Sequence, residues 1–267
     1  MARASAVVIV IMLIFALVVV VIAFSSRSGG KRPSQPKDGC GLRVVKAPQI
    51  TGGTSAYSGK WPWMVYLGNC GGTLISPTWV LTAGHCVDQT PTQEVSVGTF
   101  NLAVDELERQ RFRVKRIVIH PTYSRPTLTD DLALIELSTP VPLNDYRQPI
   151  CLPSNNQATT NRPLYAAGWG ETLSGTQPTL LQDIEIREID PCDSFRINKA
   201  KQLCARQPNA NRGICFGDSG GPLMLEENNR WIIVGISSFA TRPCFNGSGG
   251  FTRVSAYLEW IKQTAGI

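Results

Sequence analysis

Residues 79–86 read Trp-Val-Leu-Thr-Ala-Gly-His-Cys and join an expected β-strand to two side chains that can take part in chemistry. The first four residues, Trp79–Thr82, are apolar or β-branched, as is typical of a strand. His85 and Cys86 follow after a short Ala-Gly break. A disulfide needs a fixed geometry, so a bridged Cys86 would hold His85 firmly at the end of this strand.

Similar short apolar runs occur along the rest of the chain, and Gly, Pro, Asn or Asp residues separate them. They are residues 63–67, 73–75, 112–119, 132–137 and 231–238. Many short strands with turn signals between them predict an all-β sandwich or barrel. Only Val254–Ile267 has apolar residues at helical spacing, so we expect a single short helix at the C-terminus.

The N-terminal region contains an apolar span. Ala6–Phe24 carries no charge, and at about 1.5 Å per residue a helix of this length would nearly cross the ~30 Å hydrocarbon core. Residues 1–24 are therefore expected to be either an uncleaved signal-anchor or a cleaved signal peptide, since small residues at Ala23 and Ser25 would suit a signal peptidase. Residues 25–38 are rich in Ser, Gly, Lys, Arg and Pro, which predicts a flexible linker.

The net charge of +6 is confined to the N-terminal part of the chain. Residues 1–49 hold the whole excess of Lys and Arg, and residues 50–267 are neutral overall. A neutral body lacks the basic footprint that nucleic-acid-binding domains carry. The composition therefore argues against a nucleic-acid partner, and the basic N-terminal residues are typical flanks of a membrane or export signal.

The chain has eight cysteines, and no two of them form a Cys-x-x-Cys pair. The spacing of a zinc ribbon is therefore absent. An even number of cysteines in an exported chain indicates four disulfides, although the count alone leaves their pairing open. Because disulfides persist in oxidising compartments, the cysteines favour an extracellular location for the folded part.

Three segments carry residues suited to nucleophilic catalysis. His85 and His120 are the only histidines, so an imidazole base acting near neutral pH would be one of them. Ser219 lies in the glycine-rich stretch Gly217–Pro222, whose backbone is free to turn sharply and expose the hydroxyl. Asp131 leads directly into an apolar strand, where a carboxylate is costly to bury unless it is paired. The simpler alternatives are a structural histidine, a tight loop and a solvated turn residue.

Taken together, these segments resemble the chymotrypsin family of serine proteases. The matching stretches are Thr82–Cys86, Asp131–Leu134, Gly217–Pro222, Trp61–Trp63, Cys70–Gly72, Pro149–Pro153, Gly168–Gly170 and Tyr257–Ile261. The order His, Asp, Ser is that of this family and differs from the orders in subtilisins and α/β-hydrolases. The resemblance extends from Cys40 to Ile267, and within it Gly84 stands where the family usually has Ala.

The resemblance implies two packed antiparallel β-barrels with the active site in the cleft between them, in a protease domain spanning residues 50–267. His85, Asp131 and Ser219 would form the catalytic triad. The backbone N–H groups of Gly217 and Ser219 would form the oxyanion hole. The resemblance implies neither a metal nor an organic cofactor.

The resemblance also implies how the cysteines pair. The expected disulfides are Cys40–Cys151, Cys70–Cys86, Cys192–Cys204 and Cys215–Cys244.

Members of the family are made as inactive precursors, so residues 25–49 would be a linker and activation pro-segment. Cleavage would free the amine of Ile50, which would pair with Asp218. Gln49 stands before this cut, where the family usually has Arg or Lys.

The expected substrate pocket is uncharged. Gly213 lines up with the pocket floor, where trypsin-like enzymes carry an Asp. The other residues that line up with the pocket are Ile214, Ser238, Phe239, Ala240 and Gly249. Because a buried Lys or Arg would find no partner there, we expect cleavage after medium or large apolar residues. Asn246-Gly247-Ser248 is also a glycosylation sequon.

The resemblance thus predicts an extracellular serine endopeptidase that is made as a zymogen and is either tethered by residues 6–24 or secreted. Its partners would be protein or peptide substrates, an activating protease and protein inhibitors, and a monomer is the default expectation. The alternative is a catalytically silent protease homologue that acts as a binding protein.

Overall fold

The computed structural model describes residues 39–45, 56–172, 175–192, 195–208, 213–215, 217–241, 244 and 248–267. The expected signal segment 1–24, the linker to residue 38, the Gln49–Ile50 cleavage site and the sequon at Asn246 lie outside these residues. The described residues all belong to one unit, Gly39–Ile267. They form two closed six-stranded antiparallel barrels and one C-terminal α-helix, so the expected fold class is confirmed.

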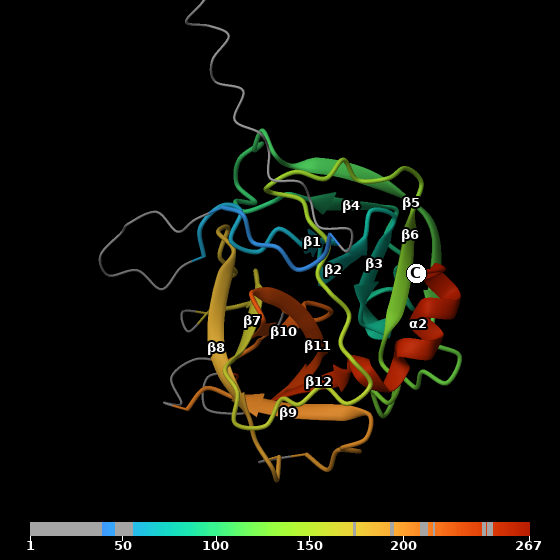
Figure 1. Ribbon diagram of the computed structural model, residues 1–267, viewed down its shortest axis with the longest axis vertical. Helices are drawn as coiled ribbons and strands as arrows, with labels where there is room; N and C mark the ends of the chain where they lie inside the picture. The colour runs from blue at the N-terminus through green and yellow to red at the C-terminus, as the bar shows by residue number, and fades with distance from the viewer. Residues whose placement is uncertain are drawn as a thin grey trace, which may run out of the picture. The chain divides into compact units, whose positions relative to one another are not determined.

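The first barrel comes from the blue to green part of the chain in Figure 1. Its strands are β1 (Met64–Tyr66), β2 (Gly71–Ser76), β3 (Trp79–Thr82), β4 (Glu94–Val97), β5 (Gln110–Ile119) and β6 (Ala133–Leu137). They close in the order β1-β2-β3-β6-β5-β4. β3 is buried along its whole length and pairs on both sides, with β2 and with β6. This burial explains why residues 79–82 form an unbroken run of strand-forming residues.

The second barrel comes from the C-terminal half. Its strands are β7 (Leu164–Gly168), β8 (Gln182–Glu188), β9 (Gln202–Arg206), β10 (Pro222–Glu227), β11 (Arg230–Ala240) and β12 (Gly249–Arg253). They close in the order β10-β11-β12-β9-β8-β7. Only β11 was expected among these strands from its apolar run. β8 is only partly buried and carries three acidic residues, so its sequence gives little strand signal.

Large aromatic side chains pack the two barrels against each other. Trp63 is fully buried, and its Nε1 donates a hydrogen bond to Sδ of Met224 from the second barrel at 2.9 Å. Trp61 and Trp231 pack edge to face with ring centres 4.6 Å apart. Since close-packed interiors resist small displacements, this contact fixes the cleft between the barrels.

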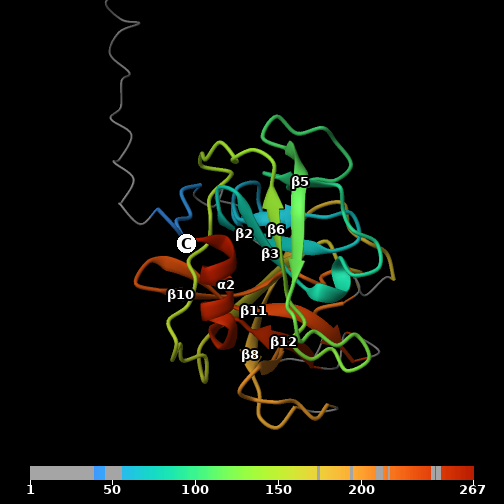
Figure 2. The same cartoon turned by 90° about the vertical axis from the view of Figure 1, so that its right-hand side faces the viewer.

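The C-terminal helix follows the second barrel and packs on the first. A 3₁₀ turn, η2 (Val254–Tyr257), leads into α2 (Leu258–Ala265), which contacts β6. Figure 2 shows α2 in front, on the side of the molecule that lies at the right in Figure 1. The expected helix is therefore present, with a 3₁₀ first turn. Nowhere in the described ranges does a helix have both the length and the apolar composition to cross a bilayer.

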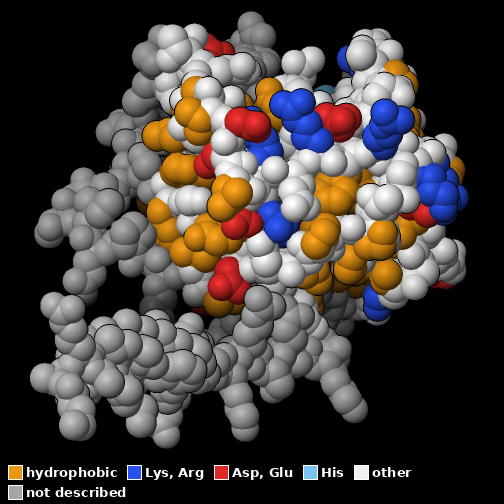
Figure 3. All heavy atoms as spheres, turned by 90° about the horizontal axis from the view of Figure 1, so that it is seen from above, with side chains coloured by type: hydrophobic (Ala, Val, Ile, Leu, Met, Phe, Trp, Pro, Cys, Tyr) orange, Lys and Arg blue, Asp and Glu red, His pale blue; other side chains and the backbone are white. Residues whose placement is uncertain are grey.

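β5 turns a row of basic side chains outward, namely those of Arg111, Arg113, Lys115 and Arg116. Lys115 and Arg116 both bind Glu136 on β6, at 2.7 and 2.5 Å. Figure 3, which views the molecule from above, shows Lys and Arg side chains interspersed with Asp and Glu. The cations of β5 are thus partly neutralised by acidic neighbours.

Four disulfides staple the described residues. They are Cys40–Cys151, Cys70–Cys86, Cys192–Cys204 and Cys215–Cys244, the same pairings that the resemblance implies. The first ties residues 39–45 to the barrels, where Trp231 N–H also donates to the carbonyl of Gly41 at 2.9 Å. The second holds the turn after β3 against the start of β2, directly beside His85.

Candidate active site

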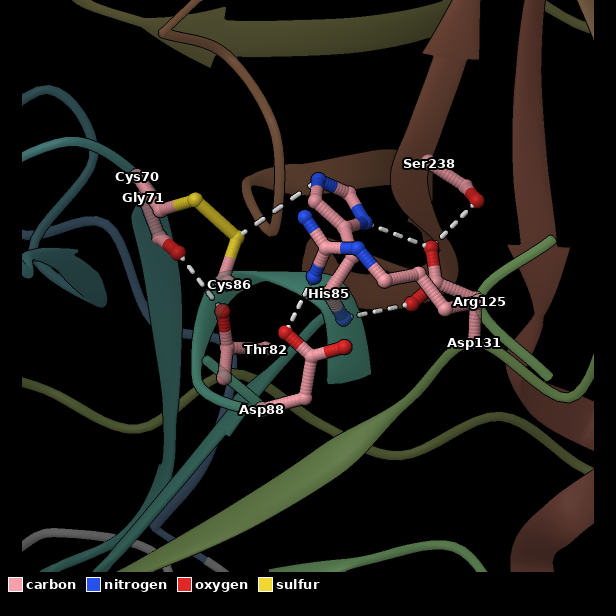
Figure 4. Close-up of a disulfide and its surroundings, with 9 residues drawn as sticks. All are labelled: Cys70, Gly71, Thr82, His85, Cys86, Asp88, Arg125, Asp131 and Ser238. Atoms are coloured by element: carbon pink, nitrogen blue, oxygen red, sulfur yellow. Dashed lines mark hydrogen bonds and ion pairs between the residues drawn. A yellow bond between two sulfur atoms is a disulfide. The ribbon is translucent and has the colours of Figure 1, made fainter. Parts of the chain in front are cut away.

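His85 lies in a short 3₁₀ turn, η1 (Gly84–Cys86), at the end of β3. The Cys70–Cys86 disulfide anchors this turn to the segment entering β2, and Cys86 Sγ lies 3.8 Å from His85 Nε2 (Figure 4). The strand on one side and the disulfide on the other fix the backbone of His85. A bridged Cys86 was expected from the sequence to hold this histidine at the end of the strand, and the structure has this arrangement.

Asp131 is fully buried and faces His85 across the cleft floor. Its Oδ2 accepts a hydrogen bond from His85 Nδ1 at 2.8 Å, and its Oδ1 accepts one from the His85 backbone N–H at 2.9 Å. Ser238 Oγ donates a third bond, to Oδ2, at 2.5 Å (Figure 4). A buried carboxylate is tolerated when it is paired and hydrogen-bonded, and these contacts also fix the orientation of the imidazole ring.

Two partners of Asp131 are not expected from the sequence. The resemblance places Ser238 in the pocket wall, and nothing in the sequence singles out Thr252, whose Oγ1 donates to the Asp131 carbonyl at 2.8 Å. They lie 107 and 121 residues from Asp131 in the chain. Only the pairing of β11 with β12 brings both hydroxyls to the buried acid, so no local sequence signal could have revealed them.

Ser219 lies on a turn of the second barrel that touches the first barrel. The Gly71 N–H donates to the Ser219 carbonyl at 2.8 Å. The next residue, Gly220, has φ +77°, and a Cβ there would lie 2.2 Å from Thr82 Oγ1 and 2.4 Å from the Gly71 carbonyl. Glycine is therefore required at 220 for the barrels to approach this closely.

A cavity of about 710 Å³ brings the expected site residues together. Its lining includes His85 from the first barrel and Gly217, Ser219, Ile214, Ser238, Phe239 and Ala240 from the second. Across the described residues, no hydrogen bond joins Ser219 Oγ to His85, and the N–H groups of Gly217 and Ser219 donate to no protein acceptor.

The carboxylate of Asp218 lies beneath this turn. It accepts hydrogen bonds from the backbone N–H groups of Gly170 and Cys215, each at 2.9 Å. A Cβ at Gly168 or at Gly170 would lie only 2.1 or 2.4 Å from atoms of this carboxyl group. Burial raises the pKa of Asp218 to about 6, although its two backbone hydrogen bonds oppose the shift.

The expected pocket residues are uncharged and closely packed. Ile214 lies against Gly249, where a Cβ would come within 2.4 Å of Ile214 Cδ1. Phe239 packs edge to face on Phe195 with ring centres 4.7 Å apart. Ile214 thus fills the space beside Gly249. Gly213 and Gly249 are described, but neither is among the cavity-lining residues.

His120, the other histidine, lies away from the cavity. Its ring packs edge to face on Trp260 and Tyr257, with ring centres 4.9 and 5.1 Å away. Burial lowers its pKa, which favours the neutral ring. His120 therefore fits the simpler alternative, a histidine with a structural role.

One cluster in the described part of the chain has the spacing of a metal site, and it consists of Cys70, His85 and Cys86. Both sulfurs are joined in a disulfide. Because metal binding requires thiolates, this cluster cannot supply a cysteine ligand.

Comparison with known proteins assigns the family. The model of the family described as Trypsin matches residues 50–261. The chain is 33% identical over 248 residues to the protein named atrial natriuretic peptide-converting enzyme from Homo sapiens. The match covers 85% of this chain and 24% of that relative, so the chain corresponds to about a quarter of the relative's length. The chain belongs to the trypsin family of serine proteases.

Proposed function

We propose that this protease domain hydrolyses peptide bonds through Ser219, His85 and Asp131. The observation that carries the proposal is the buried Asp131 carboxylate bound to His85 Nδ1 at 2.8 Å, with His85 and Ser219 lining one cavity. Asp131 holds the proton on Nδ1, which leaves Nε2 free to accept one. The shared cavity supports a reaction in which His85 and Ser219 act on one substrate.

In the proposed reaction, Ser219 Oγ attacks the peptide carbonyl while its proton passes to His85 Nε2. The carbonyl oxygen gains negative charge and is held by the N–H groups of Gly217 and Ser219, each typically worth about 3–4 kcal/mol. His85 then gives its proton to the leaving amine, and an acyl-enzyme remains. Water, deprotonated by His85, releases the acid and restores Ser219.

A cut before Ile50 is the proposed switch from precursor to active enzyme. Asp218 is the proposed receiver of the new Ile50 amine, because its carboxyl lies directly beside the turn that carries Gly217 and Ser219. The raised pKa of Asp218 supports this role, since a buried carboxyl without a cation is poorly stabilised in its charged form. Pairing would order the turn and bring Ser219 Oγ toward His85. Gln49 argues against the usual trypsin-like activator at this bond, and the alternative is a basic cut upstream, at Arg43 or Lys46, followed by trimming to Ile50.

For specificity, we propose cleavage after apolar residues. The pocket residues are uncharged, and Ile214 packed against Gly249 shortens the space, so medium-sized apolar side chains should fit best. Discrimination within this group should be modest, because one methylene is worth about 1–3 kcal/mol. A peptide library profile led by Arg or Lys at the cleaved position would contradict this proposal.

The four disulfides are consistent with an extracellular location. Tethering by residues 6–24 remains a proposal.

The test of the activity is covalent labelling by a fluorophosphonate. The probe should label the chain after cleavage before Ile50, and Ser219→Ala should abolish labelling without changing the far-ultraviolet circular dichroism. A cleaved, folded chain that takes up no probe would support the silent binding homologue instead.

A further inference from the structure

Arg125 brings a positive charge into the cavity that contains His85 and Ser219. It comes from the loop between β5 and β6, and Leu128 of the same loop lines the cavity with it. The Arg125 side chain is 45% exposed. The described residues that line the cavity include no Asp or Glu. Arg125 is the one Lys or Arg side chain among the described residues that line this cavity.

Asp88 holds the Arg125 side chain in place. Arg125 Nη1 forms an ion pair with Asp88 Oδ1, and the Tyr123 hydroxyl donates to Asp88 Oδ2 at 3.1 Å. Asp88 lies two residues after the turn that bears His85. Its N–H donates a hydrogen bond to the Gly84 carbonyl at 3.1 Å. Figure 4 shows the Arg125 side chain running past His85 to reach Asp88. The guanidinium is thus anchored to the segment that follows His85 in the chain.

Gly84 lies under the Tyr123 ring that contributes to this anchor. A Cβ at Gly84 would lie 3.2 Å from two ring carbons of Tyr123, closer than a methyl group normally packs. Without that methyl, the Tyr123 ring lies close over Gly84, and its hydroxyl reaches Asp88. A methyl at this position would also lie 3.3 Å from Asp131 Oδ1, so Gly84 leaves room for both the Tyr123 ring and this carboxylate.

The chemistry of a guanidinium indicates what it would bind. It has five N–H donors in a planar fork that matches a carboxylate. Asp88 takes the donor on Nη1, which leaves capacity for a second carboxylate. The neighbouring pocket residues Ile214, Phe239 and Ala240 are apolar, so they would take an uncharged side chain of the same substrate. The cavity therefore combines an apolar pocket with one anchored cation.

We infer that Arg125 makes the enzyme prefer substrates with Asp or Glu one or two residues before the cleaved residue. Arg125 and Leu128 face the cavity from the loop that leads to Asp131, whereas the Cys70–Cys86 bridge lies on the opposite side of His85 (Figure 4). A substrate whose cleaved residue lies in the apolar pocket would place its neighbouring residues in the same cavity, which Arg125 and Leu128 also line. The inference rests on the proposed function and names part of its substrate class.

The experiment compares pairs of fluorogenic peptides that all share one apolar residue at the cleaved position. Within a pair, one peptide carries Asp and the other carries Asn. In one pair this difference lies one residue before the cleaved residue, and in the other pair it lies two residues before. The full chain carries Gln49→Arg, so that trypsin can release Ile50. A fluorophosphonate titration counts the competent sites. The readout is the ratio of kcat/KM for the Asp peptide to that for the Asn peptide, which cancels any general loss of activity.

At one of the two positions, the unchanged Arg125 should give a ratio of about five, the size expected for a partly exposed ion pair. The ratio should decrease in 0.5 M salt because of screening. Arg125→Gln should bring it to about one, and Arg125→Glu should bring it below one. Arg116→Gln removes a similar charge from β5, outside the cavity lining, and should leave the ratio unchanged.

A labelled, active enzyme with a ratio near one at both positions would overturn this inference and leave the proposed function intact. The inference would also be overturned if Arg116→Gln lowered the ratio as much as Arg125→Gln, because the net charge of the protein would then be the cause. A cleaved chain that neither labels nor hydrolyses any peptide would overturn both the inference and the proposed function.

Discussion

Gly220 has a positive φ of +77°, and it lies where the two barrels touch. A Cβ at this position would meet Thr82 Oγ1 at 2.2 Å and the Gly71 carbonyl at 2.4 Å. Neither neighbour can move freely, because Thr82 Oγ1 donates to that same carbonyl at 2.8 Å. The position of Ser219 therefore depends on the absence of one methyl group from its neighbour.

Gly220→Ala should lower the free energy of unfolding by more than the roughly 1–2 kcal/mol of a left-handed alanine, because a steric clash adds to it. Urea unfolding measures the loss, and fluorophosphonate labelling should fall with it. Gly266→Ala is the control, since Gly266 has φ +69° but no atom lies within 4 Å of the place its Cβ would take. Equal losses in the two variants would show that the contact between the barrels is not the cause.

Asp218 should make the stability of the uncleaved chain depend on pH. Its pKa is raised from 3.8 to about 6 by burial, so the folded state binds this proton more tightly than the unfolded state. The free energy of unfolding should therefore fall as pH rises from about 4 to above 6, by on the order of 2 kcal/mol. Urea unfolding at pH 4, 5, 6 and 7 measures the slope.

Asp218→Asn should remove this contribution to the slope. In the cleaved chain, an Ile50 ammonium beside the carboxylate would stabilise its charged form and should also flatten the slope. If cleavage leaves the slope unchanged, Ile50 does not pair with Asp218.

At the scale of elements, the segment before β6 joins three parts of the fold. Asp130 accepts hydrogen bonds from Thr122 Oγ1 at 2.5 Å, Lys201 Nζ at 2.8 Å and the Tyr257 hydroxyl at 2.7 Å. These partners come from the loop after β5, the segment before β9 and the turn η2. Although burial opposes the shift, the hydrogen bonds lower the pKa of Asp130 to about 2. Asp131 is the next residue, so this network also fixes its backbone.

Asp130→Asn should destabilise the fold by about 1.5–3 kcal/mol, the usual worth of hydrogen bonds to a charged group. The difference from the unchanged chain should be largest above pH 4 and should shrink as pH falls toward 2, because the lowered pKa stabilises the charged form. Thermal or urea unfolding of both chains between pH 2 and 7 checks this.

Asp190→Asn is the matched control, because its ion pair with Lys199 is 58% and 66% exposed. Exposed pairs contribute little to stability. A similar loss in both variants would count against a special role for the buried network.

At the scale of the whole molecule, the Cys40–Cys151 disulfide links chain segments 111 residues apart. A cut before Ile50 would separate residues 1–49 from the protease domain in sequence, but this bond would keep them covalently joined. The cut enzyme should therefore migrate as one species on a non-reducing gel and as two fragments after reduction.

The double variant Cys40→Ser and Cys151→Ser should release the N-terminal fragment without reductant. Loss of that fragment from the cut, unreduced parent chain would contradict the expected linkage. If residues 6–24 stay in a membrane, the same bond would keep the active enzyme attached there.

The sequence by itself determined the fold class, the family and the disulfide pairs. Short apolar runs separated by turn residues indicated a sandwich or a barrel, because strands buried on one face need alternating or continuous apolar residues, and the family resemblance implied the two barrels and the disulfide pairs. The stretches around His85, Asp131 and Ser219 are local, so their resemblance can be read from a few consecutive residues. The weakly apolar β8 was missed, because half-exposed strands carry little periodic signal.

Only the tertiary structure decided which side chains support those residues. Ser238 and Thr252 reach Asp131 through strand pairing, and Arg125 enters the cavity because Asp88 anchors it near His85. These contacts join residues far apart in sequence. Each would be weakened if its two atoms moved apart by a few tenths of an ångström. Local sequence patterns reflect local backbone preferences, whereas hydrogen bonds between distant segments exist only once both barrels have packed.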